Sequence, residues 1–143
     1  MTKTAVIYAT KTNHSKKLAE AIASALNTEA KNIKENPVLK GLDLIFIVGG
    51  IYGGVSMPEL IEYVNKIDDQ TLKHAVLVTS CASGKQKQTN LQNILKEKGI
   101  KVIDEFVCKG NFLFVAAKHP NSNDLKEAAE FALKIASSNI KSN

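Results

Sequence analysis

The sequence predicts an α/β protein in which a parallel sheet is covered by helices on both faces. Apolar runs of strand length alternate along the chain with segments of helical period. The strand-like runs are nearly continuous in apolar residues, which is typical of strands buried on both faces. With 143 residues, 44% of them hydrophobic, the chain can bury one core and is too short for two ordinary domains, so a single domain over residues 1–143 is expected.

Five runs have the length and composition of strands: residues 4–9, 28–33, 43–48, 74–80 and 100–108. The run DLIFIV (43–48) is the most hydrophobic stretch of the chain. The run at 28–33 is the weakest, and only a short crossover, ENPVLKG, separates it from the next strand. Strands this apolar need cover on each side, which favours a parallel sheet with connecting helices over an open antiparallel one.

Four segments place apolar residues at helical spacing: Leu18–Leu26, Leu60–Ile67, 89–99 and Leu125–Ala136. Pro58 stands where the first turn of a helix tolerates proline, and Gly99 is expected to form a helix C-cap. The last helix is expected to open after Pro120, near Ser122. Four helices and one short crossover between five strands predict a three-layer, doubly wound sheet.

Charge and composition exclude several classes of function. The net charge of +5 comes from lysine alone, because the sequence has no arginine, and the lysines are scattered without interleaved aromatics. Nucleic-acid binding is therefore not expected. No apolar stretch of about 18 residues is present and the N-terminus runs directly into a strand pattern, which predicts a cytoplasmic protein without a membrane segment. Cys81 and Cys108 are expected to be reduced thiols, and His14, His74 and His119 share no metal-ligand spacing.

In a doubly wound sheet, ligands bind outside the carboxyl ends of the strands. Three segments follow strands there: TKTNHS (10–15), GGIYGGVSMP (49–58) and SCASGKQKQ (80–88). Hydroxyls and amides before a helix can be simple caps, but the N–H groups of such a loop also suit a phosphate. GGIYGG can be a tight turn, but glycines around a tyrosine also suit a planar ring. The segment at 80–88 is not a GxSxG elbow and no histidine completes a triad, so covalent catalysis is not expected.

These segments resemble the short-chain flavodoxins over essentially the full length of the chain. YATKTNHSKKLAEAI resembles the phosphate loop and first helix of that family, and DLIFIVGGIYGGVSMPEL resembles its third strand and flavin loop. The resemblance implies a five-stranded sheet of order 2-1-3-4-5 that binds FMN noncovalently. The cofactor-binding positions that it implies are Thr10, Lys11, Thr12, Asn13, His14, Ser15, Gly50, Ile51, Tyr52, Gly53, Gly54, Ser80, Cys81, Ala82, Ser83, Gly84 and Lys85.

Within this set, the resemblance implies hydroxyl contacts to the phosphate from Thr10, Thr12 and Ser15. It also implies that Tyr52 stacks on the isoalloxazine and that the peptide Gly53–Gly54 turns its carbonyl toward flavin N5 on reduction. The chain departs from the family in two places: Asn13-His14 stands where flavodoxins generally have Gly-Asn, and the loop 80–85 lacks the common second aromatic.

The resemblance implies an FMN-binding electron carrier that shuttles electrons between redox partner proteins and has no acid–base residue of its own. Two alternatives remain open: an FMN-dependent quinone or NAD(P)H reductase, and an accessory flavoprotein for one partner enzyme. Flavodoxins are usually acidic, whereas this chain is basic, which points to acidic partners or to a different role. A monomer is expected.

Overall fold

The computed structural model describes residues 3–9, 14–52, 55–68, 70–81, 89–109 and 122–139. Within these ranges, five parallel strands form one sheet: β1 (Thr4–Tyr8), β2 (Ala30–Asn32), β3 (Leu44–Tyr52), β5 (His74–Cys81) and β6 (Lys101–Lys109). Their spatial order is β2-β1-β3-β5-β6. When the parallel strands are counted by themselves, this is the order 2-1-3-4-5 that the family resemblance implied.

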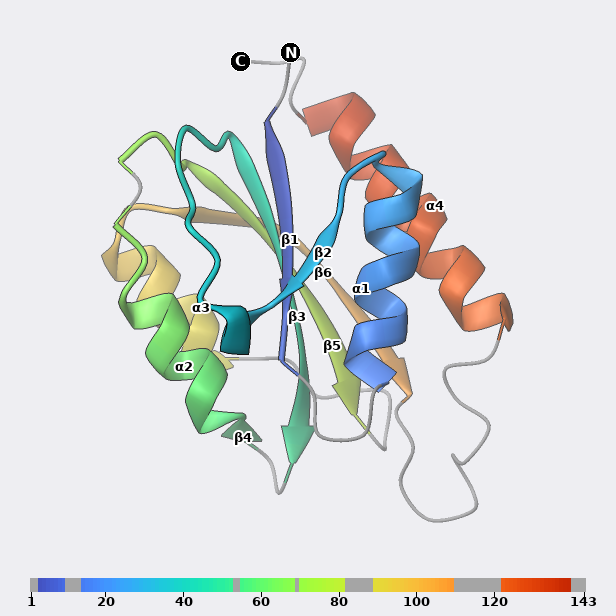
Figure 1. The fold of residues 1–143 in the computed structure, drawn as a ribbon, viewed down its shortest axis with the longest axis horizontal. Helices are drawn as coiled ribbons and strands as arrows, with labels where there is room; N and C mark the ends of the chain where they lie inside the picture. The colour runs from blue at the N-terminus through green and yellow to red at the C-terminus, as the bar shows by residue number, and fades with distance from the viewer. Residues whose placement is uncertain are drawn as a thin grey trace.

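Four α-helices complete a three-layer architecture in the described part of the chain (Figure 1). One face of the sheet carries α1 (His14–Ala25) and α4 (Ser122–Asn139), which contact each other extensively. The opposite face carries α2 (Pro58–Asn65) and α3 (Thr89–Glu97). None of these helices is both long enough and apolar enough to cross a membrane.

The apolar strands divide the core into two clusters, one on each face of the sheet. Successive strand residues point to opposite faces, so Phe46 packs toward α1 and α4 while Ile45 packs toward α2 and α3. On the first face Leu18 belongs to the core, and on the second face Leu60 and Leu95 do. This double burial explains why the central strands are apolar throughout.

The helix boundaries follow the local signals in the sequence. Pro58 is the first residue of α2, where its missing N–H has no intrahelical partner to lose. Gly99 ends α3 with a φ of +77°, and the backbone N–H of Ile100 donates to the carbonyl of Leu95 (2.9 Å). This is the pattern of a glycine C-cap, as predicted.

Two strands differ from the expected boundaries by more than one residue at an end. β3 does not end at Val48 but continues to Tyr52, and the chain then returns as β4 (Val55–Ser56), antiparallel to the end of β3. The residues Ile51 and Tyr52 favour extended backbone, so the sheet continues through a segment that its glycines suggested was a loop.

The second strand, in contrast, is shorter than expected. It ends at Asn32 because a 3₁₀ turn, η1 (Ile33–Glu35), begins there. The side chain of Asn32 accepts a hydrogen bond from the N–H of Lys34, and the backbone N–H of Asn32 donates to Glu35 Oε1. This reciprocal capping box stops the strand and starts the short crossover to β3.

Candidate functional site

The point at which the strand order reverses lies between β1 and β3. From β1 the chain passes through α1 to β2, and from β3 it passes through α2 to β5, so the two connections leave in opposite directions. The helices α1 and α2 also lie on opposite faces of the sheet (Figure 1). A crevice at the carboxyl ends of two such strands is the usual ligand site of a doubly wound fold.

At this crevice β3 extends beyond β1. The last pair between the two strands is Tyr8 with Val48, and the N–H of Ala9 then donates to the carbonyl of Val48 (3.0 Å). Beyond that point, Gly49 and Gly50 stay buried and pair with β5 on their other side. The backbone of β3 therefore forms a wall without side chains directly beside the end of β1.

Ser15, the second residue of α1, lies where that helix begins after β1. Its side chain is 1% exposed, and its Oγ has no hydrogen-bond partner among the described residues. A buried hydroxyl in this state costs about 1–3 kcal/mol relative to a paired one. Such a cost is unusual in a helix start, where serine normally caps backbone N–H groups.

The charge pattern of α1 also favours an anion at its beginning. The first backbone N–H groups of a helix have no intrahelical partner, and the helix dipole places partial positive charge there. Many helices offset this charge with an acidic residue, as α2 does with Glu59. The first turn of α1 contains no acidic residue and instead contains Lys16 and Lys17, both exposed. The helix start is thus suited to a phosphate.

The structure places part of the predicted set at this end of the sheet. Ser15 and Gly50 are described in full, and the backbone is described at His14, Ile51, Tyr52, Ser80 and Cys81. The sheet register brings two of the predicted segments together, because Gly50 pairs with Ser80. Ten predicted positions lie outside the described residues: Thr10, Lys11, Thr12, Asn13, Gly53, Gly54, Ala82, Ser83, Gly84 and Lys85.

Sequence reasoning missed a second feature, far from Ser15 along the chain. The crossover between η1 and β3 borders a cavity of about 410 Å³ that α2 closes on the other side. The sequence signals for it are the turn-forming Asn36-Pro37 and Gly41 around Val38 and Leu39, a pattern that is typical of a simple connection. No cluster of His, Cys, Asp and Glu in the described ranges could hold a metal ion.

The fold defines an α/β protein of the doubly wound class, in which the start of α1 is suited to an anion. Comparison with known proteins makes this specific: the flavodoxin domain family matches residues 5–113. The chain therefore belongs to the flavodoxin domain family. It is also 33% identical over 135 residues to an uncharacterized protein of Methanocaldococcus jannaschii, covering 85% of this chain and 89% of the relative.

Solved structures with the same fold include a flavodoxin and an azoreductase. Oxidised flavodoxin 2 from Bacillus cereus is similar with a TM-score of 0.67 and 16% identity, covering 94% of this chain and 98% of that one. The azoreductase from Bacillus anthracis is similar with a TM-score of 0.68 and 12% identity, covering 94% and 100%. Identities this low establish the shared fold and leave activity to be argued from the site.

Proposed function

We propose that this protein binds FMN at the carboxyl end of the sheet and carries electrons between redox partner proteins. The observation that carries the proposal is the buried Ser15 Oγ, which lacks a partner among the described residues at the start of a helix with no acidic first turn. A phosphate oxygen would give this hydroxyl an acceptor and would gain the dipole of α1. FMN is the cofactor typical of the family to which the chain belongs.

In this proposal a different segment of the chain binds each part of FMN. The loop Thr10–Ser15 holds the phosphate, the segment Gly50–Gly54 with Tyr52 covers one face of the ring, and the loop Ser80–Lys85 borders its other side. Bound FMN supplies one- and two-electron chemistry, while the chain binds and orients it and shields it from water. Gly49 and Gly50 of β3 allow the flavin to approach the backbone closely, because they carry no side chains.

Titration of the apoprotein with FMN, riboflavin and FAD tests the proposal. FMN should bind most tightly, because riboflavin lacks the phosphate and FAD adds a second phosphate and an adenosine. Each charge-assisted hydrogen bond lost with the phosphate is worth about 1.5–3 kcal/mol, so riboflavin should bind at least about tenfold more weakly. Equal affinity for riboflavin would rule out a phosphate site at α1.

An FMN-dependent quinone or NAD(P)H reductase is the second candidate, because the loop 80–85 has no aromatic residue to cover the outer ring face. Turnover distinguishes the two. A reductase should oxidise NAD(P)H with a quinone as acceptor at a rate that saturates with both substrates, whereas a carrier should need a separate reductase protein. The net charge of +5 favours acidic partner proteins in either case, and we expect the protein to work as a monomer.

A further inference from the structure

The crossover between η1 and β3 crosses the sheet as an extended strap. β2 ends at the carboxyl end of the sheet, since Asn32 pairs with Tyr8, while β3 begins at the amino end, since Leu44 pairs with Thr4. Residues 36–43 must therefore span the length of β1, about 16 Å for a five-residue strand. Eight residues of helix reach only about 12 Å. The chain is consequently drawn out over the sheet, as Figure 1 shows.

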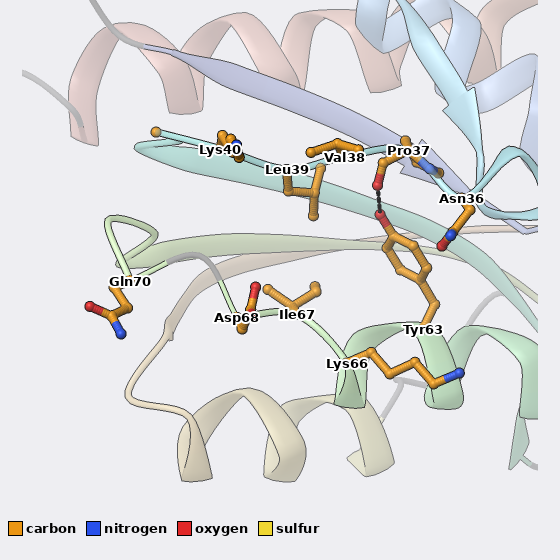
Figure 2. Close-up of a pocket in the computed structure, with 11 residues that line it drawn as sticks. Asn36, Pro37, Val38, Leu39, Lys40, Tyr63, Lys66, Ile67, Asp68 and Gln70 are labelled. Atoms are coloured by element: carbon orange, nitrogen blue, oxygen red, sulfur yellow. Dashed lines mark hydrogen bonds between the residues drawn. The ribbon is translucent and has the colours of Figure 1, made fainter.

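The strap, which we define as residues 37–40, is fixed at both ends. Left-handed residues bound it, with φ of 51° at Asn36 and 65° at Gly41. The Tyr63 hydroxyl donates to the carbonyl of Pro37 at 2.8 Å, as Figure 2 shows. Just beyond the other end, Thr71 Oγ1 donates to the carbonyl of Leu42 at 3.1 Å. The conformation of the strap is thus set before any partner arrives.

The middle of the strap has the properties of an unpaired strand. The backbone groups of Val38, Leu39 and Lys40 make no hydrogen bond to any described residue. Burial alternates with a period of two, because Pro37 and Leu39 are half-buried whereas Val38 and Lys40 are exposed. Val38 is 80% exposed, more than the other large apolar side chain on the described surface, Leu133, at 49%.

Cavities flank the strap on both sides. The larger, about 410 Å³, lies between the strap and the end of α2, and Figure 2 shows the Leu39 and Tyr63 side chains entering it from opposite walls. The smaller, about 190 Å³, lies between the strap and the strands β1 and β2. A partner chain laid along the strap would therefore find room for its side chains on each side.

Charge around the strap favours an acidic partner. The smaller cavity is lined by Lys3, Lys31 and Lys40 against one carboxylate, Glu29. These three ammonium groups form no ion pair with another described residue. Two straps from separate copies of the chain would bring like charges together, and proline and lysine on an exposed edge disfavour such self-pairing. A second copy of this protein is therefore a poor occupant.

We propose that the strap docks a short extended segment of a partner protein that carries apolar and acidic side chains in turn along one face, that is, at every second position. The backbone of that segment pairs with residues 38–40, its apolar side chains cover Val38, and its carboxylates meet Lys3, Lys31 and Lys40. Because none of the predicted cofactor positions belongs to the strap, the inference goes beyond the proposed function and stands or falls independently of it.

The probe is a blocked synthetic peptide in which valine and glutamate take turns at every second position, with threonine between them. Its control is the peptide of equal length in which lysine replaces glutamate. Titration of the ¹⁵N-labelled full chain, with and without FMN, should shift the amides of Val38, Leu39 and Lys40 with the acidic peptide. Their hydrogen exchange should slow as well, because pairing protects the N–H groups. Shifts spread over the surface, no shifts, or equal binding of the lysine peptide would overturn the proposal.

Substitutions then test which side chains contact the peptide. All the substituted side chains are exposed, so folding should be retained. Val38→Ser should weaken binding of the acidic peptide about fivefold to tenfold, whereas Leu133→Ser, the matched apolar control, should not. Lys31→Gln/Lys40→Gln should weaken it and flatten its salt dependence, whereas Lys126→Gln/Lys134→Gln should not. Equal affinities in either matched pair would overturn it. So would concentration-dependent dimerisation in sedimentation that Val38→Ser abolishes, because the occupant would then be a second copy.

Discussion

At the amino end of the sheet, side chains close hydrogen bonds onto neighbouring elements, whereas at the carboxyl end the Ser15 hydroxyl is buried without a described partner. The amino-end bonds join residues distant in sequence: Asp43 Oδ2 accepts from the N–H of Lys3 (2.8 Å), Thr71 Oγ1 donates to the carbonyl of Leu42 (3.1 Å), and Lys98 Nζ donates to the carbonyl of Ile67 (2.9 Å). The first end is satisfied by the fold alone. The second end keeps a buried polar group without a described partner, which the proposed phosphate would satisfy.

The difference between the two ends predicts that removing a hydroxyl lowers FMN affinity at the carboxyl end and lowers protein stability at the amino end. The larger effect is expected at the carboxyl end. Ser15→Ala should weaken FMN binding by about 1.5–3 kcal/mol, because it removes a hydrogen bond to a charged group. The same change should leave the stability of the apoprotein unchanged or raise it, since no described partner is lost and a buried polar atom is removed. Calorimetric titration and urea unfolding measure the two quantities.

The control for this variant is Ser137→Ala. Ser137 lies on α4 and its hydroxyl donates to the carbonyl of Lys134 (3.2 Å) at an exposed position. It should change neither FMN affinity nor stability by more than about 0.5 kcal/mol. If Ser15→Ala destabilised the apoprotein by 1 kcal/mol or more, as a lost hydrogen bond would, Ser15 would have a structural partner and the contrast between the two ends would fail.

Local signals in the sequence predicted most of the fold because they act over a few residues. Leu18 and Ile22 recur at helical spacing and are buried in the core, and Gly99 ends its helix as a glycine C-cap. The end of β3 was missed because Ile51 and Tyr52 favour strand while the glycines around them favour a turn. Sequence alone could not decide between these competing local preferences.

The candidate site was predictable only in part, for a different reason. The hydroxyl of Ser15 and its place before a helix are visible in the sequence, and so is its likeness to a phosphate loop. Its burial without a described partner is a property of the packing of α1 against the sheet, which no local pattern encodes. The strap was missed because composition does not show its unpaired backbone. The backbone is unpaired because the chain must stretch from the end of β2 to the start of β3.

Thr71→Val tests the amino end with a smaller expected effect. The substitution keeps the shape of the side chain and removes the hydrogen bond from Thr71 Oγ1 to the carbonyl of Leu42. The free energy of unfolding should fall by about 0.5–1.5 kcal/mol, while FMN affinity should stay within about twofold of the wild type. An affinity loss as large as that of Ser15→Ala would show that the two ends are coupled. The amino end would then contribute to FMN binding as well as to stability, contrary to this prediction.

The smallest expected effect concerns pH and the anchor of the strap. Burial raises the pKa of the Tyr63 phenol above its ordinary value of 10.0, and the protonated hydroxyl donates to the carbonyl of Pro37. Above about pH 10 the unfolded chain loses this proton first, so the folded state binds more protons and stability falls as the pH rises through the folded pKa. The contribution is fully present below the unfolded pKa.

Comparing the wild type with Tyr63→Phe isolates this contribution, because the lysines that titrate in the same range are common to both chains and cancel in the difference. At pH 8 the wild type should be more stable by about 1 kcal/mol, the value of one hydrogen bond. As the pH rises above 10 the difference should shrink, since the phenylalanine variant has no proton to lose at this position. Urea unfolding across that range measures it. A difference that stays constant with pH would mean that Tyr63 titrates alike in both states, and that its hydroxyl does not hold the strap to α2.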